Sequence, residues 1–538
     1  MADVTAEKIA AALDVLTSGA RDPEARSANI AYLTSEGYSP DDAQVAAARF
    51  ANAAKLADSR TRREQEQATD RETAARIASG VGLWRSADGV PFASIEINGH
   101  TENVPIRSRR FKAWLTLEFR AAKGKAPSTD ALSIAQTEAE ARAELDGDAF
   151  EVFTRVGHAD GRVYVDLCDE AWRAVEIDSE GWRVVDASPI KFQRPADSLP
   201  LPEPVRGGSL DELRSFVNAA DDDSWAMIKA WLIGTTAPDG PYPVLNLNGE
   251  QGSGKSTTSR RLREVIDPAR TITRETPKGT HDLAIAAKRS RVLVYDNLSW
   301  LTSDMSDALC RLATGGGLGT RRLYTDDEES TFYAKRPIIV NGIEEVATRG
   351  DLLSRSIVVN LPTLDAVRDE RTLNDEWQAA HPRILGGLLD ATSAALARWD
   401  SVDLGASAPR MADFARWVLA SDAVPGFLGL YADNREEAVT AEVDSSPFAT
   451  AVIAFAETAV EWEGTASALL KALEQQADAT AQLAKTWPKT AKACGDRVRR
   501  HANALRLRGV DVTFRRTGQG RLIALRASNP SDEGGLTL

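Results

Sequence analysis

The chain has 538 residues and a formal net charge of −14, and 43% of its residues are hydrophobic. This length exceeds what one hydrophobic core serves, so we expect three or four domains. No apolar run approaches the roughly 20 residues that span a bilayer, and the N-terminus shows no export-signal pattern. Cys168, Cys310 and Cys494 lie far apart, which argues against a zinc cluster and a disulfide framework. We therefore expect a cytoplasmic protein with no membrane partner.

Two regions precede the centre of the chain. Residues 1–78 repeat apolar side chains at helical spacing and predict a helical region, in which one helix starts at Ser39-Pro40. Residues 79–190 predict an α+β accessory domain, because short alternating runs are mixed with helical segments. The predicted strands are 91–97, 151–156, 162–167, 171–177 and 181–185, and the predicted helices are 109–122 and 129–145. No spaced acid pair supports a nuclease or primase there, and the prolines and glycines of 191–208 predict a linker.

A phosphate-binding pattern follows the apolar strand 244–247. Gly249 to Ser256 read G-x-x-x-x-G-K-[ST], and a helix begins at once. Glycines let successive backbone N–H groups turn toward phosphates, and the helix N-terminus adds partial positive charge. We expect Lys255 to reach the β- and γ-phosphates of ATP and the Ser256 hydroxyl to bind Mg²⁺. The predicted nucleotide-binding residues are Gly249, Gly252, Ser253, Gly254, Lys255, Ser256 and Thr257.

Three polar residues beside later strands complete the predicted catalytic site. Asp296 ends the strand 291–295 and is expected to hold Mg²⁺ or polarise the attacking water. Its neighbour Asn297 stands where many P-loop ATPases carry a second acid as general base, so either Asp296 serves both roles or another acid helps. Asn341 ends the next strand and predicts a water-positioning sensor. Arg355 precedes a further strand and predicts an arginine finger for a neighbouring subunit, with Arg349 as the alternative.

These elements, in this order, resemble the superfamily 3 helicases of viruses and mobile elements, which are AAA+ ATPases that form hexameric rings. The phrases 249–257, 296–299 and 309–316 are similar to the phage and prophage type, which resembles the helicase part of poxvirus-type primase-helicases. The resemblance covers about 210–365. It implies an AAA+ domain at 209–400, a helical lid or connector at 401–445 and a basic pore hairpin. In this chain the hairpin carries Arg321 and Arg322 at its base, but its tip is acidic.

The C-terminal region, 446–528, predicts a winged-helix DNA-binding domain. A helix over 490–507 precedes two strands, 510–516 and 521–526, which a glycine-containing turn joins. Basic residues gather here although the whole chain is acidic, as phosphate contact requires. The predicted DNA contacts in this region are Lys492, Arg499, Arg500, Arg506, Arg515, Arg516 and Arg521. A protein-docking winged helix is the alternative, and the tail 529–538 is predicted to be disordered.

The fold class expected from these patterns is a multidomain α/β protein with a P-loop AAA+ core. The resemblance implies a Mg-ATP-dependent DNA helicase or translocase of a phage or mobile-element replication system. Its expected partners are single-stranded or forked DNA, further copies of the chain in a ring, and replication proteins. The alternative is a nucleotide-switched DNA-binding or assembly protein with little turnover, which Asn297 and the acidic hairpin tip favour.

Overall fold

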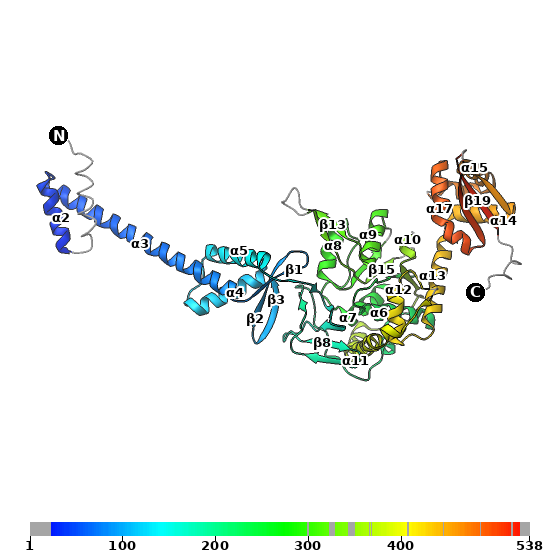
Figure 1. Ribbon diagram of the computed structural model, residues 1–538, viewed down its shortest axis with the longest axis horizontal. Coiled ribbons are helices and arrows are strands. Elements are labelled where there is room, and N and C mark those ends of the chain that lie inside the picture. The colour runs from blue at the N-terminus through cyan, green and yellow to red at the C-terminus, as the bar shows by residue number, and fades with distance from the viewer. Residues whose placement is uncertain are drawn as a thin grey trace. The chain divides into compact units, whose positions relative to one another are not determined.

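The computed structural model describes residues 23–298, 301–321, 329–342, 350–364, 366, 368–405, 408–444, 446–484, 486–517 and 520–527. The chain divides into two compact units, Met1–Phe150 and Glu151–Leu538, each with hydrophobic cores of its own (Figure 1). None of the helices in the described ranges combines the length and the apolar composition that a bilayer-spanning segment needs. The predicted tail, 529–538, lies outside these ranges.

The first unit packs helices against a small sheet. Its helices are α2 (Pro23–Ser35), α3 (Pro40–Ser79), α4 (Arg109–Lys123) and α5 (Thr129–Leu145). Its strands are β1 (Gly82–Ser86), β2 (Pro91–Ile97), β3 (His100–Pro105) and β4 (Ala149–Phe150), in the order β3-β2-β1-β4. Helix α3 begins as predicted, because the Ser39 hydroxyl accepts a hydrogen bond from Asp42 N and Pro40 suits a first turn. Phe111, Leu115 and Ala74 bring α4 and α3 into one core with the sheet.

The second unit begins with an antiparallel meander. Its strands are β6 (Val156–Ala159), β7 (Arg162–Asp166), β8 (Ala174–Asp178) and β9 (Gly181–Val185), and β5 (Val152–Phe153) pairs with β10 (Lys191–Phe192) beside it. Val163 and Val175 belong to the same core as Leu388 of helix α11 (Glu370–Arg398). The sequence grouped 79–190 in one accessory domain, but the division between the units falls inside that range. The strands on its two sides contribute to different cores, which short-range patterns do not reveal.

The segment predicted as a linker, 191–208, is packed rather than free. Leu201 is buried, and its backbone N–H donates to Leu167 O. Val205 N donates to Pro382 O, and a Cβ on Gly208 would lie 2.0 Å from Arg383 O. The segment is therefore an ordered connection that packs along the core.

A four-stranded parallel sheet forms the centre of the second unit. Its strands are β11 (Val244–Asn248), β12 (Leu293–Leu298), β15 (Ile338–Gly342) and β16 (Ser356–Asn360), in the order β12-β15-β11-β16. Successive residues alternate between two cores: Leu245 and Ile339 point into one, whereas Val244 and Ile338 point into the other. Both faces are therefore covered, as a parallel sheet requires. The shorter elements around it are η1 (Leu210–Phe216), α6 (Asp222–Gly234), α7 (Lys255–Ile266), α8 (Thr280–Arg289), α9 (Ser303–Thr314), α10 (Gly350–Leu353), η2 (Trp399–Ser401), α12 (Ala412–Ser421), α13 (Phe427–Asp444) and the hairpin β13 (Leu318–Arg321)–β14 (Glu329–Phe332).

The C-terminal part alternates helices with a three-stranded antiparallel sheet. Its elements are α14 (Pro447–Ala459), β17 (Glu461–Thr465), α15 (Ala466–Gln476), α16 (Ala479–Leu483), α17 (Ala491–Leu507), β18 (Val510–Thr517) and β19 (Gly520–Ala527), with strand order β17-β19-β18. Cys494, Val498 and Leu505 of α17 are buried against Val512 and Ile523 of the hairpin. The helix predicted over 490–507 thus packs one apolar face on the hairpin.

Candidate nucleotide site and nucleic-acid surface

The loop between β11 and α7 has the shape that its glycines allow. Gly254 is the N-cap of α7 with φ 76°, and Gly252 has φ 86°, both in the left-handed region. A Cβ on Gly249 would lie 2.6 Å from Ser253 Oγ and 2.7 Å from Leu361 O, so only glycine fits. No side chain caps α7, and its first backbone N–H groups therefore remain available to an anion.

The Lys255 ammonium lies over the start of this loop. It donates hydrogen bonds to Gly249 O at 2.6 Å and to Glu250 O at 2.8 Å, and lies 3.4 Å from Ser253 Oγ. Backbone carbonyls are neutral partners, so a phosphate oxygen would be a stronger acceptor for the same ammonium. The lysine is held beside the loop without a carboxylate among these partners.

Ser256 and Asp296 meet at the carboxyl edge of the sheet. The Ser256 hydroxyl lies in the first turn of α7 and donates to Asp296 Oδ1 at 3.0 Å. The neighbouring Thr257 is exposed in the same turn. The strand that carries Asp296, β12, does not pair with β11; it pairs with β15, which lies between them. The contact forms because α7 crosses the end of β15, so its first turn reaches the end of β12.

Asn341 lies at the end of that intervening strand and is 0% exposed. Its Oδ1 accepts a hydrogen bond from Asn297 N at 2.9 Å, and its Nδ2 donates to Ser259 Oγ at 2.9 Å. Asn297 has φ 56°, a conformation that asparagine tolerates better than most residues. The amide thus joins the tip of β12 to the P-loop helix, and its partners leave no nitrogen or oxygen directed toward solvent.

Asn218 supports the loop, although nothing in the sequence singles it out. Its Nδ2 donates to Ser253 O at 2.8 Å and to Pro362 O at 2.6 Å, and its backbone N–H donates to Thr258 Oγ1 at 3.4 Å. The side chain therefore ties the loop to the segment after β16. Its partners are 35 to 144 residues away along the chain, so no local pattern could reveal the role.

A second acid comes to the same edge of the sheet from the segment before α8. Arg274 forms an isolated parallel bridge with Tyr295: Arg274 N donates to Val294 O, and Asp296 N donates to Arg274 O. Glu275 and Asp296 are the residues that follow this bridged pair, and Glu275 is exposed. Side chains at matching positions of adjacent strands share a face. The sequence analysis left this acid unnamed, because its place depends on the pairing.

Arg355 lies at the opposite edge of the sheet. It precedes β16, whose first residue, Ser356, pairs with Val244 at the start of β11, whereas the phosphate-binding loop follows the end of that strand. Its guanidinium forms an ion pair with Asp351 and also donates to Asp351 O at 2.9 Å, which leaves the side chain 16% exposed. The structure therefore separates Arg355 from this chain's own loop. Arg349 lies outside the described residues.

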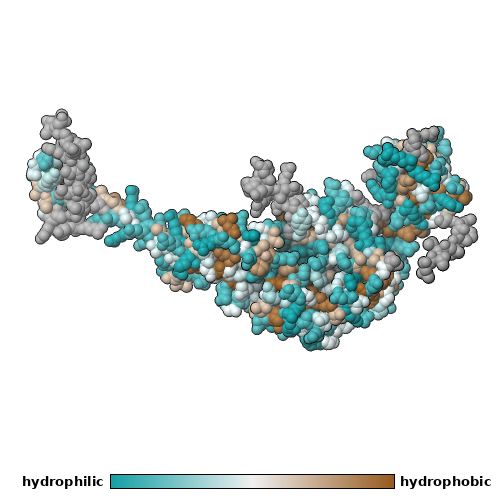
Figure 2. All heavy atoms as spheres, viewed as in Figure 1, coloured by the Kyte–Doolittle hydropathy of each residue, from teal (hydrophilic) through white to brown (hydrophobic). Residues whose placement is uncertain are grey.

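The predicted DNA contacts fall into separate groups. Lys492, Arg499, Arg515, Arg516 and Arg521 line one pocket between α17 and the β18–β19 hairpin. Arg506 donates to Val512 O and lies 3.5 Å from Asp511 Oδ1, and Arg500 is exposed on α17 outside the pocket. In the other predicted group, Arg321 is the last residue of β13, and Arg322 and the acidic tip lie outside the described residues. Figure 2 shows hydrophilic side chains over the side of the C-terminal domain that α17 occupies in Figure 1.

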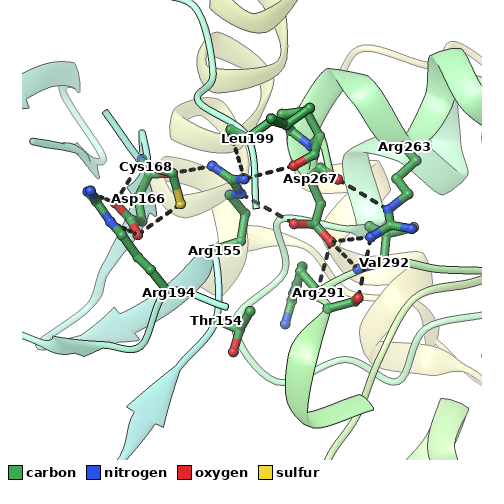
Figure 3. Close-up of polar contacts among 12 residues, drawn as sticks. Thr154, Arg155, Asp166, Cys168, Arg194, Leu199, Arg263, Asp267, Arg291 and Val292 are labelled. Atoms are coloured by element: carbon green, nitrogen blue, oxygen red, sulfur yellow. Dashed lines mark hydrogen bonds and ion pairs between the residues drawn. The ribbon is translucent and has the colours of Figure 1, made fainter. Parts of the chain in front are cut away.

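A buried ionic network supports the far end of α7 (Figure 3). Arg155 and Asp267 are each 2% exposed, and Arg155 Nε lies 3.3 Å from Asp267 Oδ1. The other guanidinium nitrogens donate to the carbonyl oxygens of Asp166, Leu199 and Pro268. Burial opposes the charge of Arg155, but the neighbouring Cys168, Asp267 and Asp166 together raise its pKa above the ordinary value. The meander is thus joined through buried charges to the helix that starts at the phosphate-binding loop.

The same network contains Cys168. Burial raises the pKa of the Cys168 thiol to about 12, so the thiol is protonated at neutral pH and donates to Asp166 Oδ2 at 3.3 Å. Arg194 Nε donates to the same carboxylate oxygen at 2.9 Å. Cys168 therefore acts as a hydrogen-bond donor within the network.

Comparisons with known proteins place two regions of the chain. Residues 210–438 match the family described as actinomycete integrative conjugative element replication protein, and residues 448–533 match the AICE RepA C-terminal domain. No curated protein matches the chain. Among solved structures, one described as the A form apo structure of the NrS-1 C terminal region is 11% identical with a TM-score of 0.38, over 84% of this chain and 97% of that chain. A structure of residues 305–718 of the same region is 13% identical with a TM-score of 0.36 over the same shares.

The two matched regions lie in tandem, carry the names of two domains of one protein family, and together cover more than half of the chain. They include the central parallel sheet and the whole of the C-terminal domain that the structure describes. The two matches support the mobile-element replication context expected from the sequence, since an integrative conjugative element is a mobile element. Residues 210–438 and 448–533 are thus similar to two successive domains of the RepA replication proteins of actinomycete integrative conjugative elements.

Proposed function

We propose that this chain, which is similar to RepA replication proteins, is a Mg-ATP-dependent DNA helicase or translocase that acts in the cytoplasm during replication of a mobile element. The observation that carries the proposal is the meeting of Ser256 and Asp296, 3.0 Å apart, beside the loop that Lys255 contacts. The sheet order β12-β15-β11-β16 supports a P-loop core of the AAA+ type. The succession of helices and strands from α14 to β19 supports a winged helix.

The residues at this edge fit a nucleoside triphosphate and Mg²⁺. The uncapped N-terminus of α7 offers backbone N–H groups to phosphate, and the loop excludes a Cβ at Gly249. A hydroxyl and a carboxylate, from Ser256 and Asp296, are oxygen donors of the kind that Mg²⁺ prefers. When bound, Mg-ATP supplies the transferable phosphoryl group and the cation that offsets its charge.

Each remaining residue then has a definite task. The Lys255 ammonium exchanges its carbonyl partners for phosphate oxygens, and Asn341 holds the tip of β12 against the P-loop helix. Position 297 holds an asparagine where many P-loop ATPases carry a second acid, and Glu275 supplies that carboxylate instead. We assign Glu275 the role of accepting a proton from the attacking water. Arg355 is the finger for a neighbouring copy, and its release from Asp351 would accompany ring assembly, with a hexamer as the expected ring.

The test is ATP turnover by the purified full chain, with and without single-stranded DNA. Lys255→Ala should lower turnover by about 10²–10³-fold, the cost of losing one charge-stabilising donor. Lys288→Ala is the matched control, because Lys288 is exposed near the end of α8, where the chain turns toward the opposite edge of the sheet. Failure of the wild-type chain to bind ATP would refute the proposed site.

A second candidate function is a nucleotide-switched DNA-binding or assembly protein with little turnover. Asn297 in the second-acid position and the ion pair that holds Arg355 favour it. The same assay separates the two functions: binding of ATP without turnover, unchanged by DNA, would leave the switch and exclude the motor.

A further inference from the structure

A pocket of about 280 Å³ opens on the C-terminal domain between α17 and the β18–β19 hairpin. We propose that this pocket binds one unpaired nucleotide of single-stranded DNA, with the base on an apolar floor and the flanking phosphates on a basic rim. The inference rests on the proposed DNA-binding function and specifies the form of DNA that this surface takes.

The rim carries five cationic side chains and one carboxylate. Lys492 and Arg499 come from α17, and Arg515, Arg516 and Arg521 come from the hairpin. The one acid in the pocket lining is Asp496, which also lies on α17. Arg499 lies 3.3 Å from Asp496, and Arg515 lies 3.7 Å from Glu463. Lys492, Arg516 and Arg521 form no ion pair with any residue that the structure describes. The rim therefore keeps a net positive charge, which attracts the phosphates of a nucleic acid.

The floor of the pocket is apolar. The charged backbone of a duplex gains nothing from contact with such a surface. Phe514, Leu522 and Ile523 line it from the hairpin, with Ala466 and Ala491 from the helices. In a duplex the faces of the bases are covered by their stacked neighbours, and only phosphates, sugars and groove edges are exposed. An unpaired base has a free face that stacks on aromatic rings and on guanidinium planes.

Arg499 and Phe514 form such a platform. The guanidinium carbon of Arg499 lies over the Phe514 ring, 4.9 Å from its centroid, and Asp496 holds the guanidinium from the side. The phenyl ring is half-buried by the domain core, so it is fixed in place before any ligand arrives. A base that enters the pocket meets a charged plane supported by an aromatic ring, with the rim cations within the same pocket for its phosphates.

The test compares a fluorescein-labelled oligothymidylate with a blunt duplex of the same length, by fluorescence anisotropy on the full chain. Phe514→Leu keeps an apolar side chain and every charge but removes the ring. Affinity for the oligothymidylate should fall by roughly tenfold, whereas duplex affinity and the salt dependence of both should stay unchanged. Phe455→Leu is the matched control, since Phe455 is a half-buried phenylalanine of the same domain outside the pocket.

Arg499→Lys is a second variant that keeps the charge and removes the guanidinium plane. It should show the same selective loss on single-stranded DNA, and it keeps the test informative if Phe514→Leu fails to fold. Equal affinities of the oligothymidylate for wild type and for both pocket variants would overturn the proposal. So would losses of equal size on single-stranded and duplex DNA. A wild-type chain that binds neither DNA would instead refute the DNA-binding function itself.

Discussion

Replacing Asp267 by asparagine should destabilise the second unit more than any single surface substitution. The carboxylate accepts hydrogen bonds from Arg155 Nε, and from the backbone N–H groups of Arg291 at 2.9 Å and Val292 at 3.0 Å. Asparagine keeps one acceptor oxygen but directs an NH₂ group toward these donors. It also leaves the buried guanidiniums of Arg155 and Arg263 without this counter-charge. Breaking a buried ion pair from one side costs about 3–5 kcal/mol, out of the roughly 5–15 kcal/mol that keep a domain folded.

The assay is pulse proteolysis across a urea series, which reports the folded fraction without requiring every domain to unfold together. Glu203→Gln is the control, because Glu203 pairs with Arg173 at 3.1 Å on the surface, where an ion pair contributes about 0–1 kcal/mol. The double variant Arg155→Met/Asp267→Asn should recover about 1–3 kcal/mol relative to the sum of the single changes, because one uncompensated charge is gone. If Asp267→Asn unfolds at the same urea concentration as Glu203→Gln, the reasoning about the network is wrong.

Three further predictions concern the nucleotide site and the response to pH. Glu275→Gln should lower ATP turnover by about 10²–10⁴-fold while equilibrium ATP binding is retained; a variant that turns over like wild type would exclude Glu275 as the base. Asn341→Ala leaves Asn297 N and the Ser259 hydroxyl unpaired, and should cost about 1–3 kcal/mol in urea unfolding; an unchanged midpoint would show that these bonds are replaced. Burial lowers the pKa of His381 from 6.5 to about 4, so the unfolded chain binds its proton first as pH falls. Stability should therefore decrease between pH 6.5 and about 4, by on the order of 3 kcal/mol; thermal melting of His381→Asn should show a shallower pH dependence than wild type, and an equal dependence would show that this imidazole is not the cause.

Local sequence patterns predicted the elements of the centre of the chain well. The phosphate-binding loop carries its own signal, because glycine positions and the lysine are fixed by the geometry of one short segment. The strand that carries Asp296, the strand that carries Asn341 and helix α17 also follow from short periodicities, although β12 continues past Asp296 to Leu298. Each of these features depends on residues that lie close together in the sequence, within about two helical turns or one strand. Hydrophobic periodicity is informative over such short separations.

Features that depend on pairing between distant segments were not predicted. The position of β15 between β11 and β12 is set by side chains on both faces of the sheet, and it decides which residues share the carboxyl edge. Glu275 and Asn218 matter only because of that arrangement. The predicted strand 151–156 is interrupted at Arg155, which has φ 66° and turns into the buried network. A charged residue in an alternating run is usually interpreted as exposed. Only the hydrogen-bond partners of Arg155, which lie 11 to 113 residues away along the chain, show that it is buried.

The buried amide of Asn341 links the position of helix α7 to the end of β12. Hydrogen bonds of 2.9 Å on both of its ends fix α7 to the backbone of Asn297, which is held in a left-handed conformation. A small shift of α7 cannot be absorbed by a rotamer change of this side chain, because the amide is fully buried and engaged on both sides. Such a shift is therefore either resisted or passed to the backbone at the end of β12. A single neutral side chain at the end of β15 thus links the helix that follows the phosphate-binding loop to the end of β12.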